Sequence, residues 1–98
     1  MKGKKFDEQK ARWCLLPWQE LEEVVKVMMH GSKKYEDFNW QKVSNGKERY
    51  FNAAMRHILA WQKGEIKDKE SDLAHLAHAV CCLLFLMWHN NPYKEVSK

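Results

Sequence analysis

Apolar residues recur along much of the chain at the spacing of three and four residues that is typical of amphipathic helices. The first such segment covers residues 18 to about 30, and Pro17 before it suits a first helical turn, where its missing amide proton is not needed. The apolar face of this segment comprises Leu21, Val24, Val25 and Met28. Gly31 is expected to cap the helix or to let it bend.

A second helix is predicted for residues 47–63, with Gly64 at its end. One side of this helix carries the apolar residues Phe51, Ala54, Met55 and Ile58, together with Gln62. Residues 36–46 between the first two helices lack periodicity and close with Ser44-Asn45-Gly46, which indicates a loop.

The third helix is expected to begin with Ser71 or Asp72 as its cap and to run to about Asn90. Its predicted core stripe consists of Leu73, Leu76, Val80, Leu83, Leu84 and Met87. A second apolar stripe consists of Ala74, Cys81, Phe85 and Trp88. A helix that is apolar on two faces needs two packing partners, so we expect part of it in a subunit interface.

The chain has no repeats and no alternation of the kind that strands show, so the predicted fold is all-α. We expect one domain over residues 1–98, a compact bundle of about three main helices, with residues 1–12 as a loosely ordered basic arm. The hydrophobic fraction of 45% and five Trp suffice for a core. Because so small a core is marginally stable alone, a homo-oligomer, dimer or tetramer, is expected.

Charge and cysteine content narrow the class of protein. The formal charge of +4 with 13 carboxylates suits phosphate ligands, whereas a dedicated nucleic-acid binder carries denser Lys and Arg, so no stable nucleic-acid partner is expected. Cys14, Cys81 and Cys82 lack zinc-type spacing and are interpreted as small core residues in a reducing compartment. No apolar leader begins the chain and residues 79–88 are too few to span a bilayer, so a cytoplasmic protein without a membrane partner is expected.

Carboxylates at two places are candidates for metal binding. Glu20 and Glu23 share one helix face, and paired carboxylates can hold Mg²⁺ or Mn²⁺. The alternative is a surface acidic turn stabilised by the helix dipole. Glu65, Asp68 and Glu70 lie in the connector before the third helix, where the alternative is a solvated turn.

Imidazoles and cations supply further candidates. His75 and His78 stand three residues apart, a spacing that permits joint ligation or hydrogen bonding to phosphate, although either could be a satisfied core residue. His57 borders the apolar face of the second helix and could likewise be simply a buried imidazole. Residues 33–40 could bind a nucleotide. They offer positive charge for phosphate and planar rings for a base, through Lys33, Lys34, Tyr35, Asn39 and Trp40. A glycine-rich phosphate loop, a G-x-S-x-G motif and an HExxH motif are absent from the sequence.

The order of these pieces resembles a known family. They are Lys5-Phe6-Asp7, Lys10, Arg12-Trp13, Leu15-Leu16-Pro17, Leu21-Glu22-Glu23-Val24, Gly31-Ser32-x-Lys34-Tyr35, Asn39-Trp40, Arg56-His57, Gly64-Glu65-x-x-Asp68 and Glu70-Ser71-x-x-x-His75-Leu76-Ala77-His78-Ala79. Over roughly residues 4–88 the chain is similar to the small, often phage-encoded dATP/dGTP pyrophosphohydrolases, which are related to the MazG-like all-α NTP pyrophosphatases.

The resemblance implies an all-α fold assembled from several copies and a divalent-metal hydrolase that converts a dNTP to its monophosphate and pyrophosphate. The metal candidates are Glu20, Glu22, Glu23, Glu65 and Asp68, with Mg²⁺ or Mn²⁺ as the ion. The catalytic candidates are Glu23, His57 and His75. The candidates for binding the purine dNTP are Lys34, Tyr35, Asn39, Trp40, Arg56 and His78.

Two departures from the family pattern stand out. Asp72 follows Glu70-Ser71 where the family generally has Gly. The pairs Glu20-x-x-Glu23 and Glu65-x-x-Asp68 match the wider family's E-x-x-E and E-x-x-D halves, but the gap between them is too long. The alternatives to a dNTP pyrophosphohydrolase are a small basic helical nucleic-acid-binding module, a structural subunit without catalysis, and a metal phosphohydrolase that cleaves a different bond.

Overall fold

The computed structural model describes residues 2–94, and these are all-helical as predicted. The elements are the 3₁₀ helix η1 (Trp13–Leu15), α1 (Trp18–Lys34), the 3₁₀ helix η2 (Asn39–Lys42), α2 (Gly46–Gln62) and α3 (His75–His89). No strand forms within residues 2–94, where the β-type pairing is an isolated bridge between Lys67 and Ala74.

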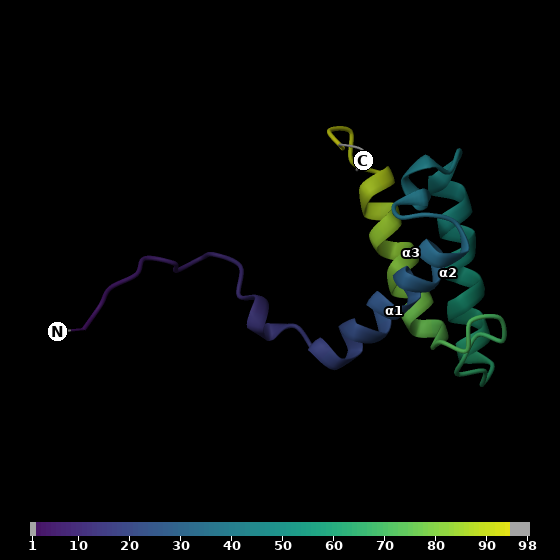
Figure 1. The fold of residues 1–98 in the computed structure, drawn as a ribbon, viewed down its shortest axis with the longest axis horizontal. Coiled ribbons are helices and arrows are strands. Elements are labelled where there is room, and N and C mark those ends of the chain that lie inside the picture. Colours follow the sequence, from purple (N-terminus) through teal and green to yellow (C-terminus); the bar gives the residue numbers. More distant parts are fainter. Residues whose placement is uncertain (1, 95–98) are drawn as a thin grey trace.

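Helix α3 is the centre of the arrangement. Helices α2 and α3 lie side by side and run in opposite directions, joined by the connector of residues 63–74, and α1 crosses against α3 (Figure 1). The buried core lies where α1 meets α3 and consists of Val24, Val27, Ala77 and Cys81. Met28, Leu73, Ala74 and Phe85 pack around it.

Two predicted helix ends are wrong. Of the two roles expected for Gly31, the cap is wrong, because α1 continues to Lys34 and a glycine is tolerated inside a packed helix, whereas a bend stays a prediction. Helix α3 begins at His75, with Ala74 at the N-cap position, and neither Ser71 nor Asp72 caps it. Asp72 has φ +58°, a left-handed conformation that belongs to the turn before the helix.

The predicted core stripe of α3 is also wrong for most of its length. Its members Leu76, Val80, Leu83, Leu84 and Met87 are exposed, whereas the buried residues of α3 are His75, Ala77, Ala79, Cys81 and Cys82. Small side chains let the neighbouring helices approach closely, so the small-residue face turns inward. Periodicity locates two apolar faces on this helix but cannot rank them.

Buried cysteines were predicted correctly at two of three positions. Cys81 and Cys82 are buried free thiols, whereas Cys14 is exposed. Burial raises the pKa of Cys81 to about 12 and that of Cys82 to about 11, so both remain protonated at neutral pH. A thiol in this state is a poor nucleophile and a poor metal ligand.

The segment before α1 projects away from the helices (Figure 1). All of its described residues, 2–17, are exposed, including Trp13 and Leu15 of η1. Met1, the first residue of the predicted basic arm, lies outside the described residues. Across residues 2–94, no helix combines the length and the hydropathy needed to cross a bilayer.

Two glycines offer a matched test of this packing. A Cβ built on Gly46 would lie 2.4 Å from His89 Cε1, and His89 Nε2 is held by donating to the Trp40 carbonyl at 2.8 Å. Gly46→Ala should therefore lower the free energy of unfolding by about 1–3 kcal/mol, as overpacking does. Gly31→Ala, with nothing within 4 Å of its Cβ, should raise it by up to about 1 kcal/mol through helix propensity. Urea denaturation measures both, and equal stability of the two variants would contradict the packing described.

Candidate functional site

A cavity of about 1120 Å³ lies between the second half of α1, η2, α2 and α3. This volume is at the upper end for small-molecule sites, so a nucleotide can be accommodated. Its wall includes apolar side chains of α1 and α3, such as Met28 and Phe85, and polar groups contributed by every element around it. Those polar groups define the candidate site.

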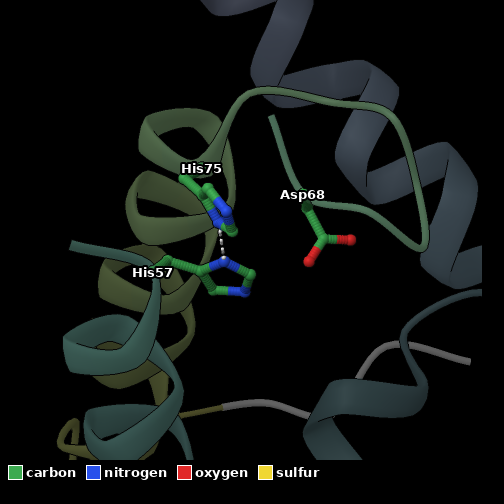
Figure 2. Close-up of side chains that lie close together, drawn as sticks. All are labelled: His57, Asp68 and His75. Carbon is green, nitrogen blue, oxygen red and sulfur yellow. Dashed lines mark hydrogen bonds between the residues drawn. The ribbon is translucent and has the colours of Figure 1, made fainter. Parts of the chain in front are cut away.

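Two imidazoles and a carboxylate meet at one end of this region. His57 comes from α2, Asp68 from the connector and His75 from the first turn of α3, and one ligand atom of each lies within 4.8 Å of the others. Figure 2 shows the three side chains projecting toward one another, with His57 Nδ1 2.8 Å from His75 Nδ1. Within residues 2–94 this is the group of metal-ligating side chains that the fold brings together.

The connector is folded so that it delivers these groups to the start of α3. The His75 amide donates to the Ile66 carbonyl at 2.9 Å, and the Asp68 amide donates to the Leu73 carbonyl at 2.8 Å. With the bridge between Lys67 and Ala74, these bonds make a hairpin-like turn. The side chain of Asp68 is thereby held beside α3 rather than in open solvent.

Glu65 orients His75. The carboxylate Oε1 of Glu65 accepts a hydrogen bond from His75 Nε2 at 2.8 Å, and His75 itself is only 4% exposed. A neutral His75 therefore carries its proton on Nε2, and its Nδ1 lone pair faces His57. The three residues form a continuous Glu65–His75–His57 chain.

His57 and His78 form a second imidazole pair. Their rings stack with centroids 4.5 Å apart and planes within 10°. Burial, aided by the nearby His78 and His75, lowers the pKa of His57 to about 4. Burial also lowers the pKa of His78. Both rings are therefore predominantly neutral at neutral pH, with nitrogen lone pairs available for a metal ion or a proton.

Ser71 holds Asp68 and His78 in place, a role that the sequence did not indicate. Its amide and its hydroxyl donate to Asp68 Oδ2 at 2.9 and 3.1 Å, and its Oγ lies 2.7 Å from His78 Nε2. Partial burial raises the pKa of Asp68, but the hydrogen bonds from Ser71 and the nearby imidazoles of His78 and His57 outweigh it and lower this pKa, so the carboxylate is ionised at neutral pH. Because the Ser71 hydroxyl proton goes to that carboxylate, His78 Nε2 is the donor to Ser71 Oγ.

Cations stand on the cavity wall near the cluster. Lys34, the last residue of α1, pairs with Glu70 of the connector at 2.5 Å, and Arg56 precedes His57 on α2. Both cations line the cavity and both are exposed, so anionic groups of a ligand can reach them.

Aromatic rings form another part of the wall. Trp40 of η2 stacks on Phe85 of α3 with centroids 4.5 Å apart and planes within 13°. Tyr50 meets the edge of Phe85 at 5.1 Å, while Tyr35 and Asn39 also line the cavity. Phe85 and Tyr50 were not among the predicted site residues, because their partners lie far away in the sequence.

The predicted site residues thus fall into two places. Those that line the large cavity are Lys34, Tyr35, Asn39, Trp40, Arg56, His57, Asp68 and His78. His75 and Glu65 join this set through their hydrogen bonds to His57 and to each other.

The α1 carboxylates lie elsewhere. Glu20 and Glu23 line a separate, largely apolar cavity of about 300 Å³, Glu23 pairs with Lys26 at 3.2 Å, and Glu22 is exposed. Within this chain they are not part of the group formed by His57, Asp68 and His75. Their roles in metal binding and catalysis stay predictions.

The depressed pKa of His57 gives a testable pH dependence. The folded protein holds this imidazole at a pKa of about 4, against the ordinary 6.5 of the unfolded chain. Between these values the unfolded state binds more protons, so stability should fall as the pH drops through this window and be fully present above it. In the presence of a chelator, the free energy of unfolding of the His57→Gln variant should fall by about 1–2 kcal/mol less than that of the wild type between pH 7.5 and 4.5.

The pKa of His78 is lowered as well, so His78 should account for part of the stability that the His57→Gln variant still loses at low pH. His89→Gln, which alters an imidazole outside the cluster, serves as the control and should retain the wild-type dependence. Urea midpoints at several pH values measure all three proteins, and identical pH profiles for His57→Gln and the wild type would contradict the environment assigned to His57.

Comparison with known proteins agrees with the resemblance carried by the motifs. Residues 1–98 match the sequence model of the family described as dATP/dGTP diphosphohydrolase, N-terminal. The chain is 39% identical over 97 residues to a protein of Salmonella phage PMBT28 named dATP/dGTP diphosphohydrolase. That similarity covers 97% of this chain but 33% of the phage protein, so the chain spans about a third of the relative's length. No solved structure matches the chain. The chain belongs to the dATP/dGTP diphosphohydrolase N-terminal family.

Proposed function

We propose that this domain hydrolyses purine deoxynucleoside triphosphates, dATP and dGTP, to the monophosphate and pyrophosphate with the help of a divalent metal ion, Mg²⁺ or Mn²⁺. The observation that carries the proposal is the meeting of His57, Asp68 and His75 at a cavity large enough for a nucleotide. The family description and the name of the phage relative support dATP and dGTP as the substrate class.

The metal would be held by the cluster. Asp68 is an ionised carboxylate and His57 is a neutral imidazole, so both are in the protonation state that ligation requires. A divalent ion held there would supply Lewis-acid chemistry, lowering the pKa of a water and neutralising phosphate charge. Imidazole and carboxylate groups together fit such an ion, and Mn²⁺ accepts both.

The remaining polar groups would bind and orient the triphosphate. Lys34 and Arg56 can contact phosphate oxygens, with the Arg56 guanidinium offering two parallel donors. Lys34 already holds Glu70, so binding of phosphate replaces one anionic partner by another. Trp40 and Tyr35 offer ring faces to the purine base.

In the proposed reaction, water attacks the α-phosphorus and forms a new P–O bond. The bond from the α-phosphorus to the bridging oxygen breaks, and pyrophosphate leaves with that oxygen. In this reaction His78 would accept the water proton at Nδ1, since its Nε2 hydrogen is engaged with Ser71.

A second copy of the chain is proposed to cover the exposed apolar face of α3. Leu76, Val80, Leu83, Leu84 and Met87 are between 39% and 71% exposed. Contiguous apolar surface of this kind is typical of association sites. The number of copies, two or four, is open to measurement by light scattering.

Product analysis tests the activity. The purified chain, incubated with each of the eight common NTPs and dNTPs and with Mg²⁺ or Mn²⁺, should release pyrophosphate and the monophosphate from dATP and dGTP. Asp68→Asn should lower kcat at least about 100-fold, because charge stabilisation at the metal is lost. Glu48→Gln, an exposed carboxylate of α2 that is bonded to Asn45, is the matched control and should leave kcat unchanged. Failure to release pyrophosphate from any purine dNTP would refute the proposal.

Substrate contacts have a separate test. Lys34→Ala and Arg56→Ala should each raise KM about tenfold or more, the loss expected for one charge-assisted hydrogen bond. Lys47→Ala removes an exposed cation at the start of α2, outside the cavity, and should have no effect. If all three variants shift KM equally, the cavity is not the site of phosphate binding. A salt-sensitive affinity for DNA that survives Asp68→Asn would instead favour a nucleic-acid-binding module.

A further inference from the structure

The donor atoms of the cluster are unusual for a site that would work with Mg²⁺ alone. Mg²⁺ prefers oxygen ligands in octahedral geometry, whereas the cluster offers two imidazole nitrogens and one carboxylate. Two histidines with one carboxylate are a set typical of first-row transition metals.

We propose that His57, His75 and Asp68 form a site that binds a transition-metal dication such as Mn²⁺, Co²⁺ or Zn²⁺ in preference to Mg²⁺. Glu65 is a positioning residue for His75 in this site and is not itself a ligand. The inference deepens the proposed function by naming the class of metal. Its test measures binding, so the two proposals can fail separately.

The nitrogen positions already suit one ion. Two ligands bound to the same ion at about 2.1 Å lie about 3 Å from each other at right angles and about 3.4 Å apart in a tetrahedron. His57 Nδ1 and His75 Nδ1 are 2.8 Å apart and come from two helices that pack side by side. An ion entering between them would replace their mutual hydrogen bond, and His57 would bind it as the tautomer that carries its proton on Nε2. The fold therefore brings the two nitrogens to ligand spacing.

Asp68 can complete the set. One carboxylate oxygen of Asp68 lies within 4.8 Å of a ring nitrogen of each histidine, so the carboxylate would have to move closer to ligate the same ion. The two hydrogen bonds from Ser71 both go to Oδ2, which leaves Oδ1 for the ion. Ser71 thus holds the carboxylate in the manner of an outer-sphere hydrogen-bond donor.

The contact between Glu65 and His75 is the strongest support. Metal-binding histidines usually donate their second ring N–H to a carboxylate, which fixes the tautomer and raises the basicity of the ligating nitrogen. Here Glu65 Oε1 accepts from His75 Nε2 at 2.8 Å, so the Nδ1 lone pair is aimed into the cluster. In Figure 2, His75 presents its ring to His57 from the start of α3, on the side where Asp68 also lies.

The competing explanation is a hydrogen-bonded Glu65–His75–His57 chain that never binds a metal. It predicts no change in the His57 or His75 resonances when metal is added. It also predicts that Glu65→Gln alters stability but no binding constant.

Cobalt is a suitable probe because its visible spectrum reports nitrogen ligation. The whole chain, freed of metal with a chelator, should bind one Co²⁺ with d–d absorption bands that Zn²⁺ abolishes by displacement. Mg²⁺ at about 100-fold excess should not displace it. His57→Ala and His75→Ala should each weaken binding at least about 100-fold, and Glu65→Gln about 10- to 100-fold. The controls His89→Gln and Glu48→Gln should bind as the wild type does.

A second measurement needs no variant and covers the case in which an alanine variant fails to fold. Zn²⁺ added to the wild type should shift the imidazole NMR signals of His57 and His75 and leave those of His89 in place. Equal competition by Mg²⁺, binding that survives both alanine changes, or unshifted His57 and His75 signals would each overturn the inference. If the chain binds the metal but releases no pyrophosphate, the inferred metal site stands and the proposed function is refuted.

Discussion

The hairpin-like turn between α2 and α3 is the constraint on which the candidate site depends. Backbone hydrogen bonds from His75 to Ile66 and from Asp68 to Leu73 fold residues 65–74 back against the first turn of α3. This fold brings Glu65 onto His75 and Asp68 into reach of His57, although these residues come from three separate stretches. Because the bonds lie in the backbone, the turn is formed independently of any ligand, and the side chains it carries are oriented in advance.

The same turn explains why the helix boundaries could not be read from the sequence. Ser71 and Asp72 have the composition of a helix cap, and local propensity favours that role. In the fold, Ser71 is instead engaged by Asp68 and His78, and the left-handed Asp72 closes the turn. Tertiary hydrogen bonds outweighed a local preference, as is common where a polar cluster has to be held.

Much of the rest was open to prediction from the sequence. Helical periodicity identified three helices and the all-α class, and the motif order identified the family. All six residues predicted to bind substrate line one cavity. The hydrogen-bonded series of Glu65, His75 and His57 could not be predicted from the sequence, because it depends on the antiparallel packing of α2 against α3. The inward face of α3 was beyond reach as well, since close helix approach selects small residues such as Ala77 and Cys81 over larger apolar ones.

The composition of the cluster bears on how a polyphosphate would be accommodated. Two neutral imidazoles and one carboxylate would leave a bound dication with a net positive charge, whereas a set of four carboxylates would make the same site anionic. A triphosphate carries several negative charges, and in a partly buried site the repulsion from surplus carboxylates is screened only weakly. The burial that keeps His57 neutral would therefore favour the binding of an anion as well as that of the proposed metal. Glu65 accepts a hydrogen bond from the far side of the His75 ring, so an ion bound at the cluster would gain a more basic ligand without a second adjacent anion.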